Sequence, residues 1–316
     1  MLLAVAFPWA FSSTLEAQSY PFKPVRMLVP FPPGGPADII ARAAAAKAGD
    51  GLGQPIVVEN RGGGGGNIAA EAVVRAAPDG YTILLLSSGV VANQSLYAKL
   101  SFNLVRDLSP IAGLGSFPLL LVAHPSTGIK TVQDLVAAAK ARPGELNYGS
   151  AGAGGGAHLA AESFRIAAAI AITHIPYKGT GPAVADLVGG QVNLMFGSVP
   201  SVLQHVRAGR LNAIGVTSAR RSSALPTTPT IAESGVAGYE ITSWFGVAGP
   251  AGLPEEIATR LNSEFRKAAG SPEFMERLNA EAGEALNMSV AQFGEFMKLE
   301  SVRWAKVVRD SGVKLD

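Results

Sequence analysis

The feature that most constrains the fold is a repeated alternation of short apolar runs and longer helical segments. A strand candidate at residues 25–31 leads into Pro32-Pro33-Gly34-Gly35, and an alanine-rich helix candidate follows over residues 36–48. Strand–turn–helix repeats build βαβ units, so the pattern predicts a parallel sheet with right-handed crossovers. Further strand candidates lie at residues 55–59, 81–86, 146–149, 171–177, 192–197 and 213–217, with helix candidates at 67–77, 130–141, 158–169, 181–189 and 199–208.

The alternation runs through the chain twice and begins again after residues 119–123. A length of 316 residues also suits two domains of about 100–200 residues each. We therefore expect two α/β modules in succession. Amphipathic helices are predicted at residues 253–270 and 289–310, and we expect both to pack back on the first module.

Composition removes several classes of function. Only 16% of the residues are charged, the net charge is +2, and the basic residues are scattered without aromatic neighbours, so we expect no nucleic-acid partner. The chain has no cysteine, which excludes disulfides, thiolate metal sites and cysteine catalysis. Its 4 histidines are isolated in the sequence, so we predict neither a metal site nor any cofactor. They are His124, His158, His174 and His205.

The first residues form an apolar stretch that is too short to span a bilayer, which needs about 20 residues. Small and polar residues follow it, and no lysine or arginine precedes it. We interpret residues 1–19 as a signal peptide cleaved near Ala17, which predicts export to the periplasm. Later apolar runs are too short for a membrane helix, so a soluble mature protein is expected.

Three turns between a strand and a helix are unusually rich in glycine, at residues 31–38, 62–67 and 149–158. Ligands of parallel α/β sheets bind beyond the carboxyl ends of strands, where glycine permits close approach and helix starts attract anions. Each turn alone could be glycine-rich merely to relieve crowding. Because the three occur together and fall in both modules, they predict a cleft that binds an anion.

One of these turns also imitates a nucleotide-binding fingerprint. Residues 152–157 fit the pattern G-x-G-x-x-A, but the strand at residues 171–177 lacks the acidic residue that binds a ribose hydroxyl. A Rossmann-type NAD-dependent oxidoreductase is therefore the alternative hypothesis. A hydrolase using Ser150 is a third, although the nucleophile motif lacks its first glycine and no base is identifiable nearby.

Two polar side chains near these turns have two interpretations each. Asp38 lies just inside the first predicted helix, where its carboxylate could cap free amides or contact a ligand. Arg42, one turn later, could simply pair with Asp38. His158 begins another predicted helix and suits either a local packing role or a ligand contact.

Taken together, the motifs of residues 20–316 resemble a known family. They include Phe31-Pro32-Pro33-Gly34-Gly35 with Asp38 and Arg42, Val58-Glu59-Asn60-Arg61, Gly65-Gly66-Asn67, Pro78-Asp79-Gly80-Tyr81-Thr82, Tyr148-Gly149-Ser150, Pro176-Tyr177-Lys178-Gly179, Gly189-Gly190-Gln191-Val192 and Pro250-Ala251-Gly252. In this order and spacing they are similar to the Bug, or TctC, family. Its members are periplasmic solute-binding receptors of tripartite tricarboxylate transporters.

The resemblance implies a two-lobed Venus-flytrap fold of type II, each lobe a mostly parallel sheet flanked by helices. Lobe 1 would comprise residues 20–121 and 241–316, and lobe 2 residues 122–240. The implied function is capture of a small carboxylate in the cleft between the lobes, for uptake or sensing and without catalysis. Its partners would be membrane permease subunits or a sensor protein, and we expect a monomer.

In the family, backbone amides, hydroxyls and ordered water hold the ligand carboxylate. The residues that the resemblance places at the ligand are Phe31, Gly34, Gly35, Ala37, Asp38, Ser87, Ser88, Ser150, Gly152, Gly154, His158, Tyr177 and Gly179. Ala37 stands where threonine is usual, and Gly155 and Gly156 replace a stretch that commonly contains serine. These departures leave the identity of the ligand open.

Overall fold

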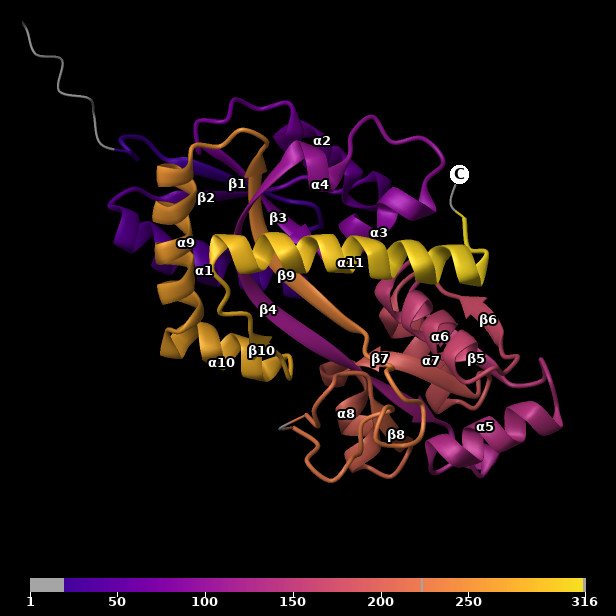
Figure 1. Ribbon diagram of the computed structural model, residues 1–316. Coiled ribbons are helices and arrows are strands. Elements are labelled where there is room, and N and C mark those ends of the chain that lie inside the picture. The colour runs from indigo at the N-terminus through magenta and orange to yellow at the C-terminus, as the bar shows by residue number, and fades with distance from the viewer. Residues whose placement is uncertain (1–19, 223, 315–316) are drawn as a thin grey trace, which may run out of the picture.

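The computed structural model describes residues 20–222 and 224–314 (Figure 1). The predicted signal peptide at residues 1–19 lies outside these described residues. Strands join in the order β2-β1-β3-β9-β4-β7-β5-β6, and β8 and β10 pair additionally with β4. Their bounds are β1 (Val25–Val29), β2 (Ile56–Asn60), β3 (Thr82–Ser87), β4 (Leu108–Ala123), β5 (Asn147–Ser150), β6 (Thr173–Pro176), β7 (Leu194–Ser198), β8 (Asn212–Val216), β9 (Thr242–Pro250) and β10 (Glu284–Ala285).

The long strand β4 belongs to both halves of the molecule. Its first part pairs with β9 between Leu108 and Pro118, and its last part pairs with β7 and β8 up to Ala123. The flanking strands pair in parallel, β1 with β2 and β3, and β5 with β6 and β7. The α/β fold class expected from the sequence is confirmed.

The antiparallel strands β4 and β9 at the centre were not predicted. The sequence of β4 contains Pro110 and Pro118, and proline within an apolar run argues against a central strand. The register between β4 and β9 shifts next to Pro110 and again near Gly113, so local irregularities accommodate residues that a regular ladder excludes.

Helices cover both faces of the strands in the first half. Leu28 and Leu84 face one side, and Met27 and Ile83 face the other, which is why these strands are apolar throughout. The helices are α1 (Pro36–Leu52), α2 (Asn67–Val74), α3 (Ser88–Leu96), α4 (Leu104–Asp107), α9 (Glu255–Ala269) and α10 (Pro272–Ala280). In the second half they are α5 (Val132–Ala141), α6 (Gly156–Ala167), α7 (Thr180–Val188) and α8 (Val199–Arg207).

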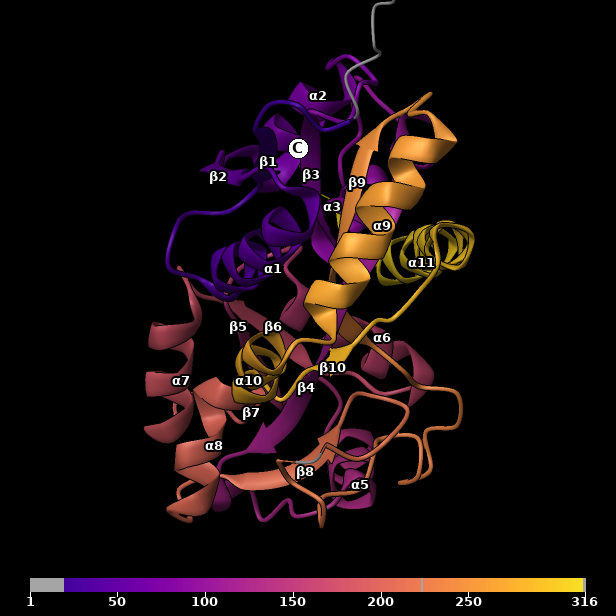
Figure 2. The same cartoon turned by 90° about the vertical axis from the view of Figure 1, so that its left-hand side faces the viewer.

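The last helix, α11 (Val290–Ser311), lies across both halves, as Figure 1 shows, and Figure 2 views it nearly end-on. It contacts α3 and β4 and also α6. Its 22 residues, at about 1.5 Å each, give a length of roughly 33 Å, and it has contacts in both halves. The expected packing on the first module is therefore correct for α9, which lies against α1, and only partly correct for α11. Across the described ranges, no helix is both long and apolar enough to cross a membrane.

Candidate functional site

A cavity of about 320 Å³ lies where the glycine-rich turns of the two halves approach each other. From the first half it is lined by residues that follow β1 and β3, and from the second by the loop between β5 and α6. The lining residues are Phe31, Gly65, Ser87, Ser88, Gly89, Asn93, Tyr97, Ala153, Gly154, Gly155, Gly156, Ser243 and Phe245. The prediction that glycine-rich turns from both modules form one cleft agrees with this arrangement.

Two helices begin at this cavity, one from each half. Helix α3 starts at Ser88, and the hydroxyl of Ser87 accepts a bond of 3.3 Å from the Val90 amide. Helix α6 starts at Gly156 after Gly155, which gives it no side-chain cap. Free amides at a helix start carry partial positive charge, so the first turn of α6 offers unoccupied donors to an anion.

None of the described lining residues carries a charge. An anion in this cavity would therefore be held by backbone amides and by hydroxyl groups such as those of Ser88 and Ser243. Glycine at positions 154 to 156 removes the side chains that would otherwise keep a ligand from the backbone.

Asp38 fixes the shape of the turn that follows β1. Its carboxylate accepts bonds from the Gly34 amide at 3.0 Å and from Asn60 Nδ2 at 2.9 Å, and it pairs with Arg42 Nε at 3.0 Å. The same Asn60 nitrogen also donates to the Phe31 carbonyl. The bond from Arg42, followed by those from Gly34 and Asn60, lowers the pKa of Asp38 to about 2. Asp38 is buried and does not line the cavity, so its observed contacts stabilise the loop. Its pairing with Arg42 is one of the two interpretations that the sequence offered.

A histidine pair supports the corresponding loop in the second half. The rings of His158 and His174 stack with centroids 3.9 Å apart, and His158 Nδ1 accepts a bond of 2.9 Å from the Gly154 amide. Burial, and then the neighbouring His174, lower the pKa of His158 to about 4. A neutral imidazole is required for Nδ1 to accept, so the environment of His158 maintains the form that holds Gly154 in place.

Ser150 lies beneath this loop and is fully buried. Its Oγ is 2.6 Å from His174 Nε2 and donates to the Gly152 carbonyl at 3.0 Å. The sequence did not reveal His174 as a partner for Ser150. The contact between Ser150 and His174 joins β5 to β6. Because the hydroxyl is enclosed, it cannot meet a substrate.

The predicted site residues therefore separate into two groups. Phe31, Ser87, Ser88 and Gly154 line the cavity. The others are not among its lining residues: Gly34, Gly35, Ala37, Asp38, Ser150, Gly152, His158, Tyr177 and Gly179. Of these, Tyr177 donates to Asp186 at 2.7 Å, and the Gly179 amide bonds the Ala151 carbonyl.

Several lining residues were missed by sequence reasoning. Asn93 lies on α3, a helix that was not predicted, and Tyr97 follows one turn later as the residue that caps its C-terminus. Ser243 and Phe245 alternate along β9. The spacing of Asn93 and Tyr97 places both on one helix face, so a prediction of α3 would have drawn attention to them.

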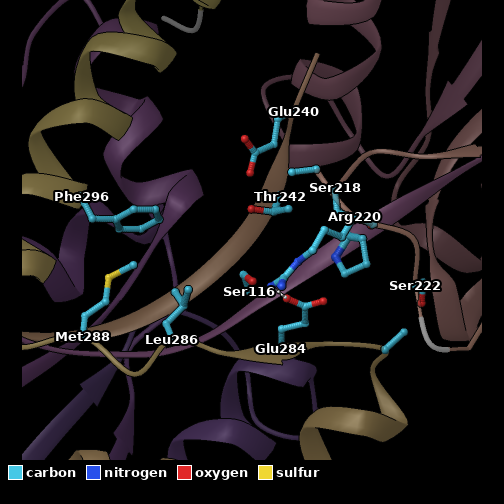
Figure 3. A pocket seen from close by; sticks show the side chains of 13 residues that line it. Ser116, Ser218, Arg220, Ser222, Glu240, Thr242, Glu284, Leu286, Met288 and Phe296 are labelled. Carbon is cyan, nitrogen blue, oxygen red and sulfur yellow. Dashed lines mark hydrogen bonds and ion pairs between the residues drawn. The ribbon is translucent and has the colours of Figure 1, made fainter. Parts of the chain in front are cut away.

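A second cavity, of about 260 Å³, lies on the opposite face of β4 and β9 (Figure 3). Thr242 and Ser116 line it, whereas Ser243 and Phe245 line the first cavity, because successive side chains of a strand point to opposite faces. In Figure 3, Arg220 reaches across to Glu284, and the two form an ion pair of 3.0 Å. No helix begins among its described lining residues, so it lacks the free amides of the first cavity.

Comparisons with known proteins show a family of receptors to which the chain is similar. Residues 40–313 match the family described as tripartite tricarboxylate transporter family receptor. The chain is 40% identical over 306 residues to protein BugT of Bordetella pertussis, which covers 96% of this chain and 94% of BugT.

Solved structures with similar folds include two with bound acids. One is Rpa4515 of R. palustris with adipate, with a TM-score of 0.78 and 36% identity over 93% of this chain and 98% of that one. The other is MatC of Rhodopseudomonas palustris with bound malate, with a TM-score of 0.76 and 31% identity over 92% of this chain and 100% of that one.

Proposed function

The chain belongs to the tripartite tricarboxylate transporter receptor family, and on that premise we propose that it captures a small carboxylate in the cavity between Ser88 and Gly154. The observation that carries the proposal is the meeting of two helix starts, from α3 and α6, in one cavity whose described lining has no charged side chain.

The chemistry of this lining suits a carboxylate better than a neutral solute. Backbone amides at a helix start donate to carboxylate oxygens, and the partial charge of the helix favours an anion without an arginine. Ordered water can extend such contacts at little energetic cost. That two similar proteins hold adipate and malate supports aliphatic acids as the ligand class for this chain.

The ligand would bind between two lobes that move relative to each other. We assign residues 20–121 and 241–316 to lobe 1 and residues 122–240 to lobe 2. The boundary falls within β4, whose first part pairs with β9 and whose last part pairs with β7 and β8. The chain passes between the lobes within β4 and again just before β9, and a ligand that contacts both lobes favours the closed state by its differential affinity.

The role in the cell follows from the same assignment. The chain is exported after cleavage of the signal peptide at residues 1–19, acts in the periplasm as a monomer, and presents its closed form to permease subunits or to a sensor protein. It catalyses no reaction, and it needs neither a metal nor a nucleotide cofactor.

A thermal-shift screen over small carboxylates and matched uncharged amides tests the proposal. A carboxylate at 100 times its Kd stabilises the folded state by about 2.7 kcal/mol, which raises Tm by roughly 5 °C for a chain of this length. We expect carboxylates to give such a shift and their amides to give none. If only uncharged solutes, or NAD, raise Tm, the proposal is wrong.

A substitution at the start of α6 separates binding from folding. Gly155 is the residue before α6, has an ordinary φ of −71°, and has room for a Cβ, whose nearest neighbour would be the Gly152 carbonyl at 3.5 Å. Gly155→Asp places a carboxylate on the free amides, so we expect an unchanged or higher Tm and a loss of ligand binding. Ser271→Asp adds the same charge before α10, far from the cavity, and should leave ligand binding intact.

A further inference from the structure

The side chain of Asn93 on α3 is held in one orientation at the wall of the cavity. It is 5% exposed, and its Nδ2 donates to the Gly65 carbonyl and to Asn67 Oδ1, both at 2.9 Å. A carbonyl oxygen can only accept a hydrogen bond. The amide nitrogen of Asn93 must therefore face Gly65, which leaves Oδ1 as the free end of the side chain.

Within the described chain, no residue donates to Asn93 Oδ1. The oxygen is not among the buried unpaired side-chain atoms of the described residues, so it is open to the cavity, where water or a donor group of a ligand can reach it. Since both hydrogens of the amide are already used, Asn93 can offer a ligand only an acceptor.

The space next to this oxygen is open because Gly65 has no side chain. Gly65 has a φ of +65°, and a Cβ there would lie 3.0 Å from Asn93 Nδ2, 3.1 Å from the Tyr97 hydroxyl and 3.4 Å from Asn93 Oδ1. The two polar groups thus converge on one point of the first half. The free amides of α6 lie on the other half of the same cavity, at Gly155 and Gly156.

We propose that the ligand is a carboxylate that also carries a hydroxyl or amino group, and that this group donates a hydrogen bond to Asn93 Oδ1. The carboxylate occupies the amides at the start of α6, and the donor group faces Asn93 and Tyr97. This assignment rests on the proposed function, and it makes Asn93 the residue that separates hydroxy and amino acids from acids without a donor.

The test is calorimetric titration at pH 7 with acids that differ by one donor: succinate against malate and aspartate, and glutarate against 2-hydroxyglutarate. In at least one pair, the acid with the donor should bind about three- to tenfold more tightly than the acid without it, which is the ratio of Kd values that one net hydrogen bond provides. In Asn93→Ala this ratio should fall to about one. Asn67→Ala removes the other partner of Asn93 Nδ2 but leaves Oδ1 in place, so the ratio should persist.

A measurement on the unmodified protein covers the case in which Asn93→Ala does not fold. The O-methyl ether of malate keeps the oxygen but lacks the donor, so it should bind no more tightly than succinate. Equal binding of the acids with and without a donor, or a preference for the donor-bearing acid that survives Asn93→Ala, overturns the role of Asn93 but not the proposed function. Failure of every carboxylate to bind overturns the proposed function as well.

Discussion

Replacing Asp38 with asparagine tests how the first ligand loop is held. The change removes the charge but keeps the volume, and it disturbs bonds from Gly34, Asn60 and Arg42. The pKa of Asp38 is lowered from 3.8 to about 2, chiefly by the bond from Arg42. At 1.36 kcal/mol per pKa unit the ionised form stabilises the fold by about 2 kcal/mol, an upper value because the Arg42 side chain is 53% exposed.

The sign of the pH dependence follows from the lowered pKa. The contribution of the Asp38 carboxylate is complete above about pH 5 and is lost as the pH falls towards 2, because the unfolded chain takes up the proton first. We therefore expect Asp38→Asn to lower the free energy of unfolding by about 2 kcal/mol at pH 7 and by about half as much at pH 3.

Urea unfolding of both proteins at the two pH values measures this difference. Asp50→Asn is the matched control, since Asp50 is exposed further along α1 and makes no side-chain bond within the described structure. A difference that is equal at pH 7 and pH 3, or below about 0.5 kcal/mol at pH 7, would refute the role given to the Asp38 carboxylate.

Three further predictions concern the loop between β5 and α6 and the cavity shown in Figure 3. Gly154→Ala, at a φ of +75°, should cost about 1–2 kcal/mol of stability and weaken carboxylate binding at least tenfold. Gly209→Ala, at a φ of +67° and away from the cavity, should cost stability alone, and equal affinities of the two variants in titration would contradict this. Because the pKa of His158 is lowered to about 4, the unfolded state takes up protons first, and the free energy of unfolding should fall as the pH drops from about 6.5 to 4. His158→Asn should reduce the slope of this fall, and a free energy of unfolding by urea that does not change over this pH range would disprove the prediction. Glu284→Gln should change the free energy of unfolding by no more than about 1 kcal/mol, and by nothing in 1 M salt, because Arg220 and Glu284 are both exposed. A change that persists in salt would exclude an effect of this ion pair.

The sequence predicted the parts of the fold that depend on local pattern. The runs around Val25–Val29 and Thr82–Ser87 are apolar because both faces of those strands are covered, and periodicity detects such runs readily. Strands β4 and β9 depend instead on pairing between segments that are far apart in sequence. Pro110 and Gly113 obscure the strand pattern of β4, and only tertiary structure provides its partner.

The candidate site divides along the same line. Glycine-rich turns after apolar runs drew attention to the segments that contain Phe31 and Gly154, whereas Ser87 followed only from the family resemblance. Asn93 gave no such signal, because the bond to the Gly65 carbonyl that fixes its orientation joins residues 28 positions apart in the sequence. The support given to Gly154 by His158 was also hidden, since stacking on His174 joins residues from different βα units.

A crystal structure of the chain with a small carboxylate, such as malate, bound from solution would show directly whether the amides at the start of α6 bind the ligand. We expect the carboxylate oxygens to lie about 3 Å from the backbone nitrogens at the start of α6, with α3 of the other half closing over the ligand. A carboxylate bound instead beside Arg220 in the cavity of Figure 3, with the amides of Gly155 and Gly156 unoccupied, would contradict this expectation.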